Sequence, residues 1–156
     1  MKVHTQEWGT LEVREEQTVH FPDGLLGFEE LHGFVLLEIE ECRPFLWLLS
    51  MDEPGVSFAL AEPRFFQSGD YRVHLSSTDE ERLQLAEGDT LGIFVIVTAD
   101  PQRGVAANLR GPIVMNMRNR LARQVITYGA GLTLRQPLCV GQEVPAAFAE
   151  VAGNRI

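Results

Sequence analysis

The residues that most often carry catalysis or metal binding are few in this chain and stand far apart. They are His4, His20, His32, His74, Cys42 and Cys139. Metal sites need ligands that converge, and the HxH, HxxxH, HExxH and CxxC spacings that achieve this locally do not occur. The sequence therefore predicts no metal site and no cofactor.

Cys42 has the best local setting for nucleophilic chemistry. It lies between Glu41 and Arg43, and a neighbouring guanidinium lowers the pKa of a thiol. Catalysis would also need a histidine base, which only a distant segment can supply. The alternative interpretation is that Cys42 and Cys139 are two small buried residues without a disulfide framework. The sequence gives no positive evidence for an enzyme, and a Cys42-dependent enzyme is kept only as an alternative.

Signals for phosphate binding are equally weak. Gly129-Ala130-Gly131 is a lone GxG, and a P-loop is impossible because Lys2 is the only lysine. Arg118, Arg120 and Arg123 form a basic cluster that could contact RNA phosphates, but no aromatic stacking platform is interleaved with them. On an extended strand Arg118 and Arg120 share one face, which favours a solvated strand edge. A contact for an acidic protein patch is the next interpretation.

The charge distribution favours a basic protein partner over nucleic acid. The net charge is −9, and residues 1–99 carry 19 acidic against 6 basic residues. Such a surface repels phosphate backbones, so direct nucleic-acid binding is not expected, whereas a basic protein would be attracted. Acidity kept for solubility alone is the alternative. Acidic pairs in expected loops are the candidate contacts, with one neighbouring aromatic that is either core or contact: Phe28, Glu29, Glu30, Asp52 and Glu53.

Short apolar runs separated by Pro, Gly or acidic residues predict a mainly β protein. The expected fold is a small antiparallel β-barrel-like single domain with one or two short helices. Residues 91–98 are apolar on both faces and predict a central strand buried on both sides. One helix is predicted near residues 78–85, capped by Ser77 with Glu80. Further strands are expected at residues 3–6, 9–13, 18–21, 34–39, 45–50, 57–61, 105–109, 113–116 and 123–128.

The segment 106–116 is the most distinctive of the chain, although it contains no nucleophile, carboxylate or histidine. Gly111-Pro112 predicts a turn or bulge between two strands. Asn108 and Asn116 are expected to fix the backbone by side-chain hydrogen bonds. We therefore interpret these four residues as a structural motif and not as a site.

The length of 156 residues fits one domain. Residues 1–10 lack the apolar region of a signal peptide, and no apolar run approaches the roughly 20 residues that span a bilayer. We therefore expect a soluble, cytoplasmic protein that does not bind membranes. Residues 139–156 are expected to be a C-terminal tail outside the main domain, and residues 146–151 leave two alternatives open, a short docking helix or partial disorder.

Several motifs, in order, resemble the family of flagellar assembly factors called FliW. Residues 21–29 read F-P-D-G-L-L-G-F-E and resemble the block F-P-x-G-[IL]-x-G-F-E, and residues 107–116 resemble A-N-L-x-[AG]-P-I-V-x-N. The segment 44–58 resembles a further block, although Leu49 replaces a frequent Gln. Ala106 likewise stands where Thr is frequent. The resemblance covers about residues 1–138.

This resemblance implies a small, non-catalytic β-barrel-like domain. FliW-like proteins bind flagellin and also CsrA, a small RNA-binding translational repressor. By sequestering CsrA when flagellin is scarce, such a protein couples the flagellin level to flagellin translation. The expected partners are thus CsrA and flagellin, and the alternative is a non-catalytic adaptor with another partner.

Overall fold

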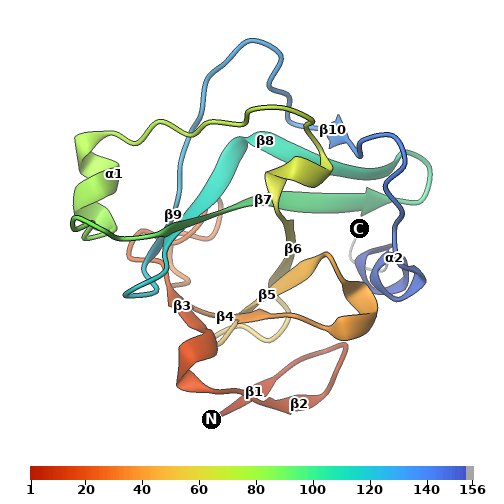
Figure 1. Ribbon diagram of the computed structural model, residues 1–156. Helices are drawn as coiled ribbons and strands as arrows, with labels where there is room; N and C mark the ends of the chain where they lie inside the picture. The colour runs from red at the N-terminus through yellow and green to blue at the C-terminus, as the bar shows by residue number, and fades with distance from the viewer. Residues whose placement is uncertain (154–156) are drawn as a thin grey trace.

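Antiparallel strands make up most of the regular structure in residues 1–153, which the computed structural model describes (Figure 1). Three single 3-10 turns lie at Glu15–Gln17, Glu40–Cys42 and Pro63–Phe65. The strands and helices are β1 (Lys2–His4), β2 (Thr10–Glu12), β3 (Thr18–His20), β4 (Gly33–Leu37), β5 (Leu46–Ser50), β6 (Ser57–Ala61), α1 (Ser77–Arg82), β7 (Leu91–Asp100), β8 (Gly104–Asn116), β9 (Ala122–Gln124), β10 (Gln136–Pro137) and α2 (Ala146–Gly153).

One eight-stranded sheet organises the molecule. Its order is β10-β8-β7-β6-β5-β4-β3, with β9 pairing to β8, and every pairing is antiparallel. The sheet curls into a half-barrel whose ends approach each other: the His20 amide of β3 donates to the Arg120 carbonyl just before β9, at 3.0 Å. Strands β1 and β2 form a separate hairpin that lies below β4 and β5 in Figure 1. The mainly β fold predicted from the sequence is therefore confirmed.

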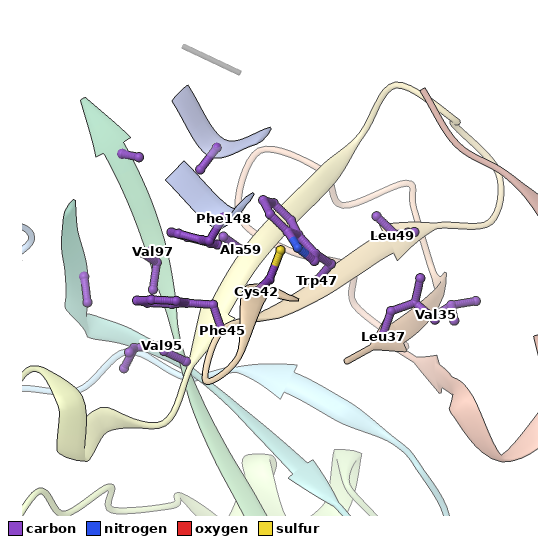
Figure 2. Packing of buried hydrophobic residues seen from close by; sticks show 14 of the residues in the cluster. Val35, Leu37, Cys42, Phe45, Trp47, Leu49, Ala59, Val95, Val97 and Phe148 are labelled. Atoms are coloured by element: carbon purple, nitrogen blue, oxygen red, sulfur yellow. The ribbon is translucent and has the colours of Figure 1, made fainter. Parts of the chain in front are cut away.

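The first face of the sheet carries the larger core. Alternation along β4 and β5 directs Val35, Leu37, Trp47 and Leu49 to this face. Helix α2 closes it with Phe148, whose ring stacks on Phe45 at a centroid distance of 4.0 Å (Figure 2). Helix α2 is thus one of the two alternatives that the sequence left open for this segment, and it packs into the core; residues 154–156 of the expected tail lie outside the described residues.

The second face of the sheet is only partly covered. The segment between β3 and β4 places Phe21 and Leu25 over Phe34, Leu48, Leu60, Ile113 and Met115. Farther from that segment, Phe94 and Ile96 of β7 stay half-buried and Thr98 is exposed. The prediction that residues 91–98 are buried on both sides is therefore wrong for this face, since no described segment covers it fully.

Strand β8 is continuous, where the sequence predicted two strands. Its ladder with β7 breaks between two pairs, Ile96–Asn108 and Phe94–Ile113, so four residues of β8 lie opposite Val95 alone. This bulge changes which face the odd-numbered residues occupy: Leu109 lies in the core of the first face, and Ile113 in that of the second. Gly111-Pro112 was predicted as a turn or bulge between two strands; the structure has a bulge there, but inside one continuous strand.

Helix α1 begins one residue earlier than predicted. Ser76 is the N-cap, and its hydroxyl accepts from the Asp79 amide at 3.1 Å while the Asp79 carboxylate accepts from the Ser76 amide at 2.9 Å. The predicted cap, Ser77 with Glu80, is wrong because a capping box of equal spacing begins one position upstream. No helix in residues 1–153 is both long and apolar enough to cross a membrane.

Candidate partner-binding groove

A groove of about 480 Å³ opens beside the segment between β3 and β4, where the turn between β5 and β6 approaches it. We call it the acidic groove. Both segments contribute to its lining, which combines apolar side chains with three glutamates. The lining residues are Gly27, Phe28, Glu29, Glu30, Leu31, Glu53 and Val56.

The acidic groove gathers four of the five residues that the sequence marked as candidate contacts. Phe28, Glu29, Glu30 and Glu53 line it, although the third glutamate is 23 positions away in sequence. Asp52 is exposed and lies in the same turn as Glu53 without lining the groove. The Ser50 hydroxyl holds this turn by accepting from the amides of both acidic residues, at 3.2 and 3.0 Å.

The sequence left open whether Phe28 is a core residue or a partner contact, and the structure gives it features of both. Its side chain is 37% exposed, yet its ring packs edge-on against Phe58 of β6 at a centroid distance of 5.2 Å. An aromatic ring held in place by one face and open on the other is a typical interface anchor. Phe28 is therefore a contact candidate that the fold fixes in position.

The carboxylates of the acidic groove are not neutralised from within the chain. Among residues 1–153, no salt bridge involves Glu29, Glu30, Asp52 or Glu53. Within the same residues, the one hydrogen bond to these carboxylates comes from the Gly27 amide, which donates to Glu29 Oε1 at 3.1 Å. The groove therefore has a negative potential that a positively charged surface would complement.

A tight local structure fixes the groove's longer segment. Two backbone hydrogen bonds join Leu25 and Phe28. The Leu25 amide donates to the Phe28 carbonyl at 3.3 Å, and the Phe28 amide donates to the Leu25 carbonyl at 2.7 Å. Gly24 makes this possible, because its φ is +66° and a Cβ there would lie 2.5 Å from the Phe28 carbonyl oxygen. Only glycine fits such a backbone conformation at such a close approach.

Side chains of β9 hold the same segment from its other side. Gln124 accepts from the Leu26 amide at 3.0 Å and donates to the Gly111 carbonyl at 3.1 Å, so it joins the groove segment to the bulge of β8. Arg123 pairs with Asp23 and with Asp79, at 2.7 Å in the second case. No local spacing in the sequence predicts either role, because only the folded chain brings residues about 100 positions apart together.

The predicted arginine cluster does not form a solvated basic edge. Arg123 serves the pairs just described, and Arg118 forms a salt bridge with Asp89 at 2.7 Å. Arg120 donates to the Thr18 carbonyl at 3.1 Å and has a left-handed backbone with φ +63°. The interpretation of an extended strand is therefore wrong for residues 118–120, because they form a turn.

The structural motif of β8 supports the site from a distance. Asn108 Oδ1 accepts from the amides of Arg110 and Gly111 at 2.9 and 3.2 Å, and thereby stabilises the bulge ahead of Pro112. Asn116 is fully buried and donates to the Leu83 carbonyl and the Asp89 carboxylate, both at 3.0 Å. The hydrogen bonds that the sequence predicted for both asparagines are present. The hydrogen bond from Arg118 holds the pKa of Asp89 well below its usual range.

Cys42 lies in the core of the first face. It is buried beside Phe45 and Trp47 (Figure 2), whereas Cys139 is half-buried, and both thiols are free. This position fits the interpretation of Cys42 as a small buried residue and leaves no room for a substrate at its sulfur. Within the described part of the chain, no three His, Cys, Asp or Glu side chains converge as metal ligands would.

We expect the Gln124→Ala variant to loosen the groove segment without unfolding the domain. The substitution leaves the Leu26 amide without its acceptor, and a single hydrogen bond of this kind contributes about 1 kcal/mol. Hydrogen exchange at Leu26 should therefore accelerate about fivefold, while the amides of β5 and β6 keep their protection. Gln142→Ala is the control, because this exposed side chain has no such role. Equal exchange at Leu26 in both variants would contradict the role given to Gln124.

Comparison with known proteins agrees with the motifs of the sequence. The chain matches the family described as FliW protein over residues 2–138. It is 37% identical over 138 residues to a flagellar assembly factor FliW of Geotalea uraniireducens, covering 88% of this chain and 83% of that one. It is 40% identical over 127 residues to the factor of Geobacillus kaustophilus, covering 81% and 87%.

A solved structure supports the fold as well. A crystal structure of the flagellar assembly factor FliW superposes with a TM-score of 0.76 at 34% identity, over 87% of this chain and 95% of the other. The family match over residues 2–138 includes the acidic groove and the bulged strand. The chain belongs to the FliW family of flagellar assembly factors.

Proposed function

We propose that this protein is a cytoplasmic regulator that binds CsrA and flagellin directly, and that the acidic groove is its contact for CsrA. The observation that carries the proposal is the group of exposed carboxylates at the groove, which has no cationic partner among residues 1–153. A repressor that holds RNA needs a basic surface for the phosphates. An acidic groove would complement that surface and at the same time repel the RNA.

In the proposed regulation, CsrA and flagellin compete for this protein, so that binding of one releases the other. When flagellin is scarce, the protein is free to sequester CsrA and translation of flagellin proceeds. When flagellin accumulates, it occupies the protein, and CsrA returns to its RNA. The family membership supports a role in flagellar assembly, and the groove's charge supports a basic partner. An adaptor with a different basic partner is the second candidate, supported by the same charge.

Size-exclusion chromatography of the purified proteins tests the proposal. The full chain should co-elute with CsrA at moderate salt, and added flagellin should displace CsrA from the complex. Failure to co-elute with either protein would refute the proposed function. Co-elution with flagellin alone would refute the CsrA branch and leave the flagellar role in place.

Charge reversal tests the groove itself. The double variant Glu29→Lys, Glu30→Lys should slow association with CsrA at least tenfold at low salt and reduce the salt dependence of the rate, because electrostatic attraction mainly sets the association rate. Stopped-flow mixing measures both quantities. Glu40→Lys, Glu41→Lys is the control, since these exposed residues follow the far end of β4 and the change in net charge is the same. Equal slowing by both double variants would show that only total charge matters.

A further inference from the structure

The open part of the sheet's second face carries a row of large apolar side chains. We call it the apolar strip; it extends from β4 across β5 and β6 to β7. Its members are all half-buried and consist of Leu36, Leu46, Phe58, Phe94 and Ile96. Contiguous apolar surface of this kind on a soluble domain usually marks a binding surface.

Strand register places these side chains side by side. Leu36 is paired with Leu48 and Leu48 with Phe58, which gives one row across three strands. Leu46 is paired with Leu60 and Leu60 with Ile96, which gives the next row. The four strands from β4 to β7 span about 15 Å at the usual strand spacing. A single α-helix, about 10–12 Å across with its side chains, covers two to three of these strands.

The apolar strip is continuous with the acidic groove. Phe28 lines the groove and its ring contacts Phe58 of the strip. Met51, 37% exposed, follows β5 toward the same end. One surface therefore runs from the apolar strip onto the carboxylates of the groove.

The charges at the two ends of this surface differ. At the groove end, Glu29, Glu30 and Glu53 form no salt bridge within residues 1–153, as described above. Toward the other end, two glutamates are each paired with an arginine: Glu38 with Arg43, and Glu62 with Arg64 at 2.7 Å. The surface is thus apolar along its length, and the glutamates that line it without an arginine partner lie at the groove end.

We propose that this combined surface binds an amphipathic α-helix of a protein partner, with the apolar face of the helix on the strip and its basic residues over the acidic groove. The inference rests on the proposed function, since it specifies the form of the basic partner at the same groove. A helix packed on this face would bury the apolar strip, as helices bury the apolar faces of sheets in α/β domains. A second copy of this chain fits less well, because it would bring further carboxylates and only 13 basic residues against 22 acidic ones.

Two synthetic peptides test the surface without CsrA or flagellin. Both are 18-residue helices with leucines at i, i+3, i+4 and i+7 spacing; one ends in three lysines and the other in three glutamates. Methyl NMR spectra of the full chain should shift at Leu36, Leu46 and Ile96 with the lysine peptide, and the glutamate peptide should bind at least tenfold more weakly. Equal binding of the two peptides, or shifts centred away from the strip, would overturn the proposal.

A pair of variants separates the strip from exposed apolar residues in general. Ile96→Gln should weaken binding of the lysine peptide at least fivefold, while Ile126→Gln, at a side chain that is 48% exposed elsewhere, should not change it. Unchanged methyl signals of the core of the first face verify that both variants are folded. A milder variant, Leu46→Ala, replaces Ile96→Gln if that fold check fails, with the same expected weakening.

The outcomes separate the two proposals. Because the peptides contain neither partner, a failed co-elution with CsrA and flagellin would refute the proposed function while the peptide result still decides on the surface. Conversely, absent peptide binding overturns the helix-docking surface even when both protein complexes form. Self-association through the strip, detected as a dimer by light scattering that Ile96→Gln abolishes, would also overturn it.

Discussion

The Phe148→Ala variant is expected to lower the free energy of unfolding by about 3–5 kcal/mol, the usual cost of removing a buried aromatic ring. Phe148 is fully buried, stacks on Phe45 and lies 5.3 Å from Trp47, measured between ring centroids. Its loss would leave a cavity between α2 and the sheet that these two rigid aromatic rings cannot fill. Urea unfolding followed by tryptophan fluorescence measures the effect.

Glu150→Ala in the same helix is the control for this variant. Glu150 is exposed, so its replacement should change the free energy of unfolding by less than about 0.5 kcal/mol. A similar small value for Phe148→Ala would mean that helix α2 contributes little to the core. The comparison is informative because the helix follows residue 138, where the match to the family ends.

The second large effect is expected at Asp79, which both caps α1 and joins that helix to β9. The Asp79→Ala variant should lose about 2–4 kcal/mol at neutral pH, about 1 from the cap and the rest from a partly buried ion pair with Arg123. The remaining pair of Arg123 with Asp23 limits the loss, because the guanidinium keeps one carboxylate partner. Thermal and urea unfolding measure the difference.

Acid should remove this contribution. Burial raises the pKa of Asp79, but the hydrogen bonds from the Ser76 backbone and from Arg123 outweigh it, so the pKa lies below its usual range. A carboxyl with a lowered pKa in the folded state stabilises the protein above about pH 4, and the stabilisation is lost as the pH falls through the folded-state pKa. The gap between wild type and Asp79→Ala should therefore narrow below pH 4.

An exposed pair provides the matched control for Asp79. Asp70 and Arg72 also form a salt bridge at 2.7 Å, but both side chains are more than two-thirds exposed. Asp70→Ala should therefore cost less than about 1 kcal/mol. If Asp79→Ala costs no more than Asp70→Ala, the coupling between α1 and β9 is not a stabilising element of this fold.

Local sequence patterns predicted the bounds of a strand well where an apolar run is closed by turn residues at both ends. The β6 segment was bounded correctly because its apolar run ends at a proline and an acidic cluster. The apolar pattern of β7 predicted burial on both faces, and this is wrong for one of them. Phe94 and Ile96 are apolar, yet they lie on a face of the sheet that other segments cover only partly. An apolar binding surface and a buried core have the same signature in sequence.

The sequence allowed the acidic residues of the groove to be chosen as candidates, but not the side chains that hold the groove segment in place. Glu29, Glu30 and Glu53 stood out because they are acidic and lie in loops, which needs no knowledge of tertiary structure. Arg123 and Gln124 act on residues about 100 positions earlier in the chain, and no local spacing reveals such contacts. The spacing of the arginines therefore predicts a surface cluster, whereas in the folded chain all three form ion pairs or hydrogen bonds with distant residues.

The bulge of β8 gives the sheet its curvature through surplus chain length. Four residues of β8 lie opposite the single residue Val95, and two of them accept hydrogen bonds from the segment that follows β9: the Pro112 carbonyl from Val125 at 2.9 Å and the Arg110 carbonyl from Thr127 at 2.8 Å. The extra length lets β8 leave one neighbour and follow another. In a redesign, adding or removing residues at 109–112 should therefore change the curvature of the half-barrel without any change in the side chains around it.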